Sequence, residues 1–255
     1  GLPTELGLLS ATLTSLSVRG NRFMDGSVPT ELGALTSLEE LFLGETSLSG
    51  WLPTELGRAS LLVNLVACGT RALPSELGLL SALTALDAST CGFTGSLPTE
   101  LGQLAGLHTA LLAPAVDATS PPTAFSGPLP SELGRLGALS RLEMAKSSLG
   151  GQLPTELGAL SSLAAFQPAA ASGTLPTELG GWSALTRFAP GYWRNPLTGT
   201  LPTELGGWLR ARDVAAVDLR MGGSVPTEVG RWTGLEQLRI GELGFSATLP
   251  SEGGG

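Results

Sequence analysis

The sequence predicts an α/β solenoid, a right-handed ribbon of stacked coils with a parallel β-sheet along one side and short helical turns along the other. A hexamer of the form Leu-Pro-Thr-Glu-Leu-Gly recurs ten times, and a Leu-x-x-Leu-x-Leu pattern follows most copies. Recurrence at a period of about 24 residues is the sequence signature of a repeat architecture. The copies begin at Leu2, Val28, Leu52, Leu73, Leu97, Leu129, Leu153, Leu175, Leu201 and Val225, and a broken copy occupies residues 249–255.

Each repeat predicts two elements. In the second unit, Leu41 and Leu43 alternate with other residues, as in a short strand with one buried face. The Pro-Thr-Glu-Leu-Gly segment then turns the chain into a short helical or 3-10 stretch on the opposite side. So short a coil cannot bury its own leucines, so coils must stack and their strands must form a parallel sheet. Ten strands would form a ladder about 45 Å long.

The recurring pattern resembles the plant-type leucine-rich repeat, L-x-x-L-x-x-L-x-L-x-x-N-x-L-x-G-x-I-P-x-x-L-G-x, over essentially the whole chain. The resemblance implies a parallel sheet on the concave side, short helices or 3-10 turns on the convex side, and ligand binding on the concave face. The asparagine of the pattern is present only as Asn21. Thr46, Cys91 and Ser147 stand in its place elsewhere, and we expect them to bond the backbone less fully.

We expect residues 1–255 to form one solenoid, with an insertion loop at residues 113–128. The third and ninth units are expected to be about three residues short after the strand, at residues 68–72 and 220–224. Neither end carries a cysteine-flanked cap. We therefore expect flanking sequence or a partner to cover the terminal coils. The chain begins at Gly1 without an initiator Met and ends on Gly253, Gly254 and Gly255, so we expect it to be a processed or excised piece.

Composition excludes several classes of protein. Hydrophobic residues make up 42% of the chain and charged residues 14%, which argues against a disordered chain. No apolar run approaches the roughly 18 residues of a membrane-spanning helix. The net charge of −8 argues against a nucleic-acid partner. A disulfide between Cys68 and Cys91 is conceivable, but their two-residue offset in register favours small buried thiols.

A column of glutamates is predicted by the stacking, and Thr or Ser precedes each member. We expect the hydroxyls to cap free amides at the helix starts and the carboxylates to meet the positive ends of the helix dipoles. An ice-binding threonine array is an alternative, although each Thr lies beside a charged Glu. A cation- or mineral-binding ladder is another, although one Glu per coil offers few of the oxygens that Ca²⁺ needs. The column comprises Glu5, Glu31, Glu55, Glu76, Glu100, Glu132, Glu156, Glu178, Glu204, Glu228 and Glu252.

No arrangement of residues predicts an enzyme, a cofactor or a metal site. His108 has no base or nucleophile at a recognisable spacing, and the two cysteines do not form a Cys-x-x-Cys pair. Trp182, Trp208 and Trp232 occupy the same position in consecutive units and are expected to stack as an aromatic core spine.

Outward positions on the strands supply the candidate partner-binding residues. Three of them, Phe42, Val66 and Leu111, are apolar in one neighbourhood, which points to a protein contact. The central outward column, by unit, is expected to be Ser17, Phe42, Val66, Asp87, Leu111, Glu143, Gln167, Ala189, Asp218 and Arg239.

The C-terminal third adds a basic group of candidates. Arg187, Arg220 and Arg239 are expected to project from the concave sheet, either to receive an acidic partner or as a solvated face that balances the glutamates. The loop with Tyr192, Trp193 and Arg194 has the composition of an interface hot spot.

Three functional hypotheses follow. The first is a non-enzymatic protein-interaction or scaffold module within a larger assembly, which binds partners through the concave face, the inserted loop or the uncapped ends. The second is an extracellular receptor-like, ligand-binding ectodomain, although the chain has no Asn-x-Ser/Thr sequon. The third is an ice-, mineral- or cation-binding surface protein. An extracellular or organelle-lumenal location is favoured over the cytoplasm, and the chain itself is expected to contain no transmembrane segment.

Overall fold

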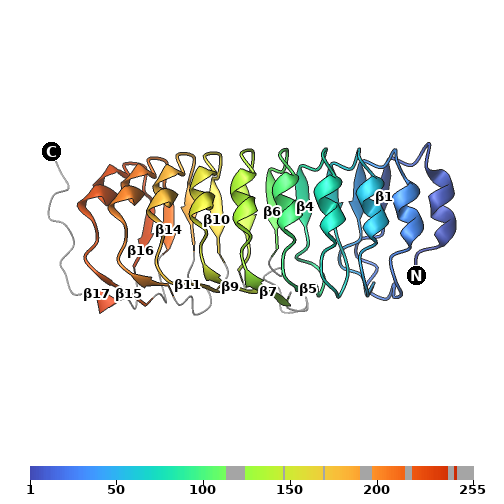
Figure 1. Cartoon of the computed structure of the whole chain (residues 1–255), viewed down its shortest axis with the longest axis horizontal. Helices are drawn as coiled ribbons and strands as arrows, with labels where there is room; N and C mark the ends of the chain where they lie inside the picture. Colours follow the sequence, from blue (N-terminus) through green and yellow to red (C-terminus); the bar gives the residue numbers. More distant parts are fainter. Residues whose placement is uncertain are drawn as a thin grey trace.

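Each hexamer starts a 3-10 helix, and each following leucine segment leads into a short strand (Figure 1). The computed structural model describes residues 1–112, 124–145, 147–168, 170–189, 197–215, 220–240 and 244–245. The helices are η1 (Thr4–Leu9), η2 (Thr30–Ala34), η3 (Thr54–Arg58), η4 (Ser75–Leu79), η5 (Thr99–Gln103), η6 (Ser131–Arg135), η7 (Thr155–Ala159), η8 (Thr177–Gly181), η9 (Thr203–Gly207) and η10 (Thr227–Arg231).

The main sheet has ten parallel strands, one from each coil. Leu41 pairs with Leu16 on one side and with Leu65 on the other, so equivalent residues of consecutive coils lie side by side. The predicted solenoid fold and its parallel sheet are therefore confirmed. In spatial order the strands are β1 (Ser15–Ser17), β2 (Glu40–Phe42), β3 (Asn64–Val66), β4 (Ala85–Asp87), β6 (Thr109–Leu111), β8 (Arg141–Glu143), β10 (Ala165–Gln167), β12 (Arg187–Phe188), β14 (Asp213–Ala215) and β16 (Gln237–Arg239).

Two smaller parallel sheets, which the repeat pattern did not predict, run along another side of the solenoid (Figure 1). Their strands lie between a main strand and the next hexamer. One of them, β7, occupies the last five residues of the expected insertion loop, whereas residues 113–123 lie outside the described part. The strands are β5 (Thr94–Gly95), β7 (Ala124–Pro128), β9 (Ser148–Gln152) and β11 (Ala170–Ser172) in one sheet, and β13 (Thr198–Gly199), β15 (Arg220–Gly223) and β17 (Gly244–Phe245) in the other.

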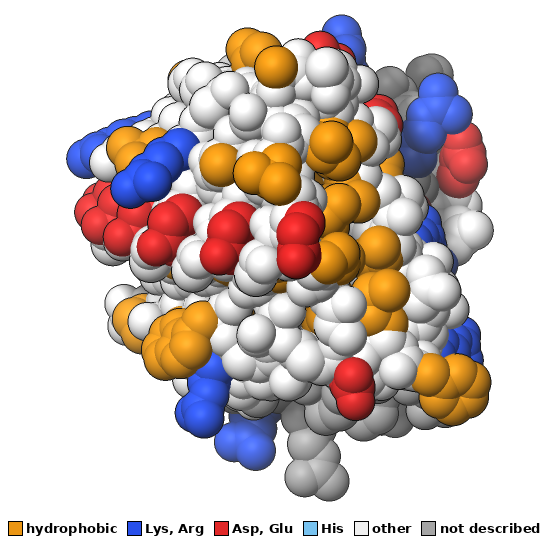
Figure 2. Space-filling view, turned by 90° about the vertical axis from the view of Figure 1, so that its right-hand side faces the viewer, with side chains coloured by type: hydrophobic (Ala, Val, Ile, Leu, Met, Phe, Trp, Pro, Cys, Tyr) orange, Lys and Arg blue, Asp and Glu red, His pale blue; other side chains and the backbone are white. Residues whose placement is uncertain are grey.

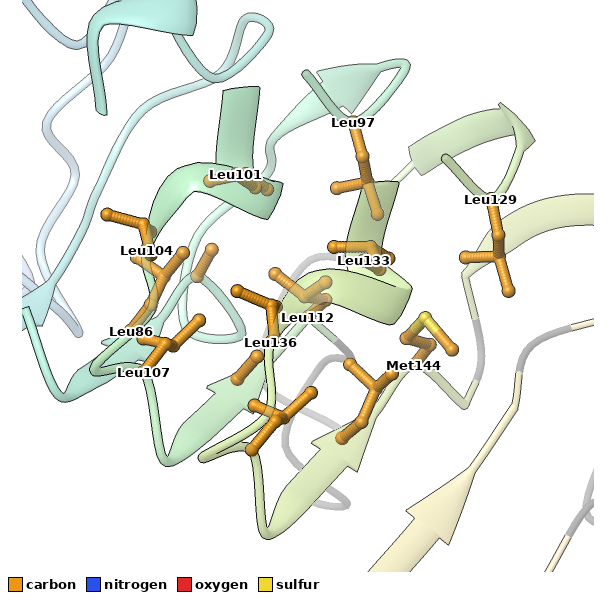
Figure 3. Close-up of a cluster of buried hydrophobic side chains, with 14 of the residues drawn as sticks. Leu86, Leu97, Leu101, Leu104, Leu107, Leu112, Leu129, Leu133, Leu136 and Met144 are labelled. Atoms are coloured by element: carbon orange, nitrogen blue, oxygen red, sulfur yellow. The ribbon is translucent and has the colours of Figure 1, made fainter. Parts of the chain in front are cut away.

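The leucines of the repeat form one continuous core between the main sheet and the 3-10 helices. Figure 3 shows Leu101, Leu104 and Leu107 of one coil beside Leu133 and Leu136 of the next. All five side chains are at most 3% exposed. Each coil thus buries its leucines against its neighbours, as a repeat without a core of its own must do.

The glycine of the hexamer sets how closely the helices of adjacent coils approach. A Cβ added to Gly102 would lie 2.4 Å from the carbonyl oxygen of Glu132 and 2.7 Å from its Cβ. Gly33 and Gly134 meet the next glutamate in the same way, each at 2.3 Å from its carbonyl oxygen. These contacts explain why the hexamer ends in Leu-Gly: only a residue without a side chain fits between stacked coils.

The predicted aromatic spine is present in coils eight to ten. The ring centroids of Trp182 and Trp208 are 6.0 Å apart, and those of Trp208 and Trp232 are 5.7 Å apart, with nearly parallel planes in both pairs. Each indole N–H donates a hydrogen bond to a leucine carbonyl of the preceding coil. The N–H of Trp208, for example, donates to Leu179 at 2.7 Å. The spine therefore joins the coils by polar as well as apolar contacts.

The expectation of buried thiols was wrong, because Cys68 and Cys91 form a disulfide. Their Cα atoms are 5.1 Å apart, within the range that a disulfide requires. The third coil is short after its strand, so its chain turns sooner and Cys68 lies beside Cys91 despite the register offset. Both cysteines belong to the buried core.

The turn after the strand is held by a side chain in several coils. The Asn21 side-chain amide donates to the carbonyl of Val18 at 2.8 Å. The hydroxyls of Thr46 and Ser147 likewise donate to the carbonyl three residues earlier, each at 2.7 Å. A hydroxyl thus makes the same backbone bond as the asparagine, and the expected weakening of these turns is not seen in this contact.

Candidate partner-binding surface

The solvent side of the ten-stranded sheet, here called the concave face, presents two columns of outward residues. The first column contains Ser15, Glu40, Asn64, Ala85, Thr109, Arg141, Ala165, Arg187, Asp213 and Gln237. The second contains Ser17, Phe42, Val66, Asp87, Leu111, Glu143 and Gln167, with Arg239 toward the C-terminal end; Ala215 occupies the same column but is buried.

Phe42 and Val66 are partly buried neighbours on β2 and β3, and we call this pair the apolar patch. A Cβ on Gly44 would lie 2.7 Å from the Cγ1 of Val66 and 2.6 Å from the hydroxyl of Thr90, so these two residues close over Gly44. Leu111 does not join the patch. Asp87 lies between it and Val66, so the expected group of three apolar residues divides into a pair and a single residue.

Two carboxylates flank the apolar patch, and we call Glu40 and Asp87 the acidic group. The Glu40 carboxylate accepts a hydrogen bond from the Ser15 hydroxyl at 3.0 Å. Asp87 accepts hydrogen bonds from the backbone N–H and the hydroxyl of Ser89. Neither carboxylate forms an ion pair within the described part of the chain. No Lys or Arg occupies an outward position on β2, β3 or β4, so this region of the face carries uncompensated negative charge.

The opposite end of the face carries two arginines that share one aspartate, and we call Arg187 and Arg239 the basic group. The Arg187 Nε lies 3.6 Å from one Asp213 carboxylate oxygen, and the Arg239 Nη2 lies 3.3 Å from the other. Both guanidinium side chains keep more than 40% of their surface exposed. One carboxylate cannot neutralise two guanidinium groups, so a positive charge remains available on these three strands.

The middle of the face is nearly balanced in charge. Arg141 and Glu143 form an ion pair at 2.8 Å on β8. The neighbouring strands carry neutral outward residues, including Thr109 on β6 and Gln167 on β10. The concave face is therefore negative toward the N-terminal end, neutral in the centre and positive toward the C-terminal end.

The placement expected for the ninth coil was wrong. Val214 pairs with Phe188 and Leu238 in the main sheet, so Ala215 takes the column position expected for Asp218, which lies outside the described residues. In the sequence, residues 214–219 fit a strand in either of two registers. The earlier register is the one in the structure, because it places Val214 at the usual spacing from the buried Trp208. The ninth unit is thus not shortened after its strand.

This change of register moves one predicted site residue, Arg220, away from the concave face, although its side chain stays exposed. Arg220 begins β15, which pairs with β13 in a smaller sheet, and so does not project from the concave face. Tyr192, Trp193 and Arg194 lie outside the described part of the structure.

The glutamate column lies on the 3-10 side of the solenoid, where acidic side chains form a row in Figure 2. The expected capping by hydroxyls was wrong. Proline occupies the N-cap of each 3-10 helix without a side-chain cap bond, for example Pro98 before η5. Thr99 is therefore the first helical residue, and its hydroxyl donates instead to the Glu100 carboxylate at 3.2 Å. Among the described residues, no group of His, Cys, Asp or Glu side chains could hold a metal ion.

The single histidine is exposed, and its Nδ1 lies 2.7 Å from the carbonyl oxygen of Gly106. Within the described ranges no helix is both long and apolar enough to cross a membrane. An ion pair joins Arg212 and Glu236 at 2.8 Å, and it was not expected from the sequence. Its two members occupy equivalent positions of consecutive coils just before the strand, a signal that the repeat alignment contained.

These features define the class of protein: a parallel-sheet repeat solenoid with a chemically varied concave face. No protein-family model and no curated protein matches the chain. Among solved structures, it is similar to the plant peptide hormone receptor RGFR1 in complex with RGF2, with a TM-score of 0.84 and 27% identity over 95% of this chain. PEPR1–AtPEP1 gives a TM-score of 0.77 and 27% identity over 98% of the chain. A TDR receptor gives 0.82 and 25% identity over 91%.

The repeated hexamer and these similarities show that the chain has the plant-type leucine-rich-repeat fold. It spans 38% of the RGFR1 chain, 38% of the PEPR1 chain and 40% of the TDR chain.

Proposed function

We propose that this chain is a non-enzymatic ligand-binding module that holds a polypeptide partner on the concave face, in the manner of a receptor-like ectodomain. The observation that carries the proposal is the concave face itself. Its outward residues combine a partly buried apolar patch with uncompensated charges of both signs on one continuous sheet. Such a mixture suits a protein partner, because apolar contacts supply affinity and charges supply orientation.

The comparisons support the hypothesis of a receptor-like, ligand-binding ectodomain over the hypothesis of a scaffold module. RGFR1 was solved in complex with RGF2, and PEPR1 with AtPEP1. The disulfide between Cys68 and Cys91 supports an extracellular or organelle-lumenal location, because disulfides persist in oxidising compartments.

The test uses photo-crosslinking at two matched glutamines. Gln167 lies on β10 in the concave face, whereas Gln103 ends η5 on the opposite side. A photoreactive phenylalanine analogue at Gln167 is expected to form a defined adduct with one polypeptide in extracts of the source organism, and the same analogue at Gln103 is not. Crosslinking only from Gln103, or from neither position, would contradict the proposal.

A further inference from the structure

Charge along the concave face is segregated by coil. The acidic group lies on β2 and β4, and the apolar patch lies beside it on β2 and β3. The basic group lies on β12 and β16, on either side of the strand that carries Asp213. Between the two groups, β6, β8 and β10 carry neutral residues and one internal ion pair.

From this segregation we propose that the occupant of the face is an extended polypeptide segment with opposite charges at its two ends. Its basic side chains lie over Glu40 and Asp87, and its acidic side chains lie between Arg187 and Arg239. The inference rests on the proposed function. It adds the chemistry of the partner and states which end of the face holds its basic side chains and which holds its acidic side chains.

The spacing of the strands sets the length of this segment. The acidic group is centred on β3 and the basic group on β14, which is six strand steps away in the sheet. At about 4.8 Å per step, the two groups are about 29 Å apart. An extended chain advances about 3.3 Å per residue, so the basic and acidic side chains of the partner are separated by about nine residues.

The state of the charged groups supports their availability to a partner. Glu40 and Asp87 accept hydrogen bonds only from Ser15 and Ser89 among the described contacts, so a cation would add a charge partner that they lack. The aliphatic stem of a lysine or arginine can lie on the apolar patch while its head group reaches these carboxylates. At the other end, an incoming carboxylate would supply the second negative charge that two arginines sharing Asp213 require.

The experiment uses three synthetic peptides of about fourteen residues and the folded chain. The first has two lysines and a leucine at one end, a neutral Gly/Ser spacer, and two glutamates about nine residues from the lysines. The second has the same composition with lysines and glutamates alternating, and the third replaces all charged residues by serine. Each peptide carries one fluorophore, and binding is followed by fluorescence anisotropy at low and high salt.

We expect the segregated peptide to bind at least about tenfold more tightly than the alternating peptide, and high salt to reduce this preference. Glu40→Lys combined with Asp87→Lys is expected to remove the preference. The control, Glu156→Lys combined with Glu178→Lys, makes the same change in net charge on the 3-10 side and is expected to retain it. Similarly, Arg187→Glu combined with Arg239→Glu is expected to remove the preference, whereas Arg135→Glu combined with Arg231→Glu is not.

Equal binding of the two charged peptides, absence of binding by both, or an equal loss in the control variants would overturn the inference. Circular dichroism of each variant shows whether it remains folded. The failure of the charge-segregated model would leave the Gln167 crosslink intact, whereas the failure of the proposed function would remove that crosslink as well. The two outcomes are thus distinguishable.

Discussion

The close contact at the hexamer glycine makes Gly102→Ala the sharpest test of the stacking. The new Cβ would lie 2.4 Å from the Glu132 carbonyl oxygen and 2.7 Å from the Glu132 Cβ. The carbonyl oxygen is a backbone atom of the next coil, so it cannot move aside by itself. Relief of the clash therefore requires coils five and six to separate. Overpacking of a well-packed interior costs about 1–3 kcal/mol, and a backbone obstacle places this substitution at the upper end of that range.

The matched control is Gly137→Ala, in the coil that follows. No heavy atom lies within 4 Å of a Cβ at Gly137, and its φ lies outside the left-handed region. Alanine there restricts only the unfolded chain and is expected to stabilise by about 0.4–1 kcal/mol. Chemical unfolding followed by circular dichroism gives both free energies of unfolding. If Gly102→Ala were no less stable than Gly137→Ala, the coils would not be packed against this glycine as described.

Three further substitutions test other parts of the structure. Replacing both Cys68 and Cys91 by Ala should lower the free energy of unfolding by about 3 kcal/mol, because the disulfide closes a loop with a sequence separation of 23 residues; an unchanged unfolding midpoint under non-reducing conditions would show that no such bond forms. Trp208→Phe should cost about 1–3 kcal/mol through the lost indole hydrogen bond and the lost volume, whereas the exposed Trp51→Phe should change stability by less than about 0.5 kcal/mol; equal thermal shifts in the two variants would contradict the buried spine. Thr99→Ala should cost less than about 0.5 kcal/mol, because its hydroxyl bonds an exposed carboxylate and caps no amide; a loss of about 1 kcal/mol or more in chemical unfolding would restore the capping interpretation.

The fold was predictable because every coil buries its leucines in the same way, against the coils beside it. Leucines at the positions of Leu35, Leu38 and Leu41 are fully buried, and the same spacing recurs in nearly every unit. A single ambiguous unit can be misread in isolation, as the ninth was. The count from Trp208 through Ala211 to Val214 would have given the correct register, because it repeats the spacing of Leu136, Leu139 and Leu142 in another coil.

The capping and the disulfide were harder to predict, because both depend on where the backbone turns. Threonine before glutamate is a common N-terminal helix pattern, but here proline holds the N-cap and shifts the hydroxyl by one position. The offset between Cys68 and Cys91 argued against a bond because the expected shortening of the third unit, at residues 68–72, was not applied to the comparison of their registers. A shortened third coil brings the two together, and that geometry emerges from three-dimensional packing.

The residues of the candidate site were predictable only in part, because Glu40 and Asp213 were not among the expected outward residues and Arg220 does not lie on the concave face. Phe42, Val66, Arg187 and Arg239 were identified as outward positions from their place in the repeat, and the structure puts them on the concave face. Their grouping depends on which strands lie side by side and on which charges pair internally. The ion pair of Arg141 with Glu143 makes the centre of the face neutral, so the net charges lie at its two ends and have opposite signs. A solenoid holds such groups at a fixed spacing, so a partner must match that spacing as well as the charges; this is why the peptide test varies order at constant composition.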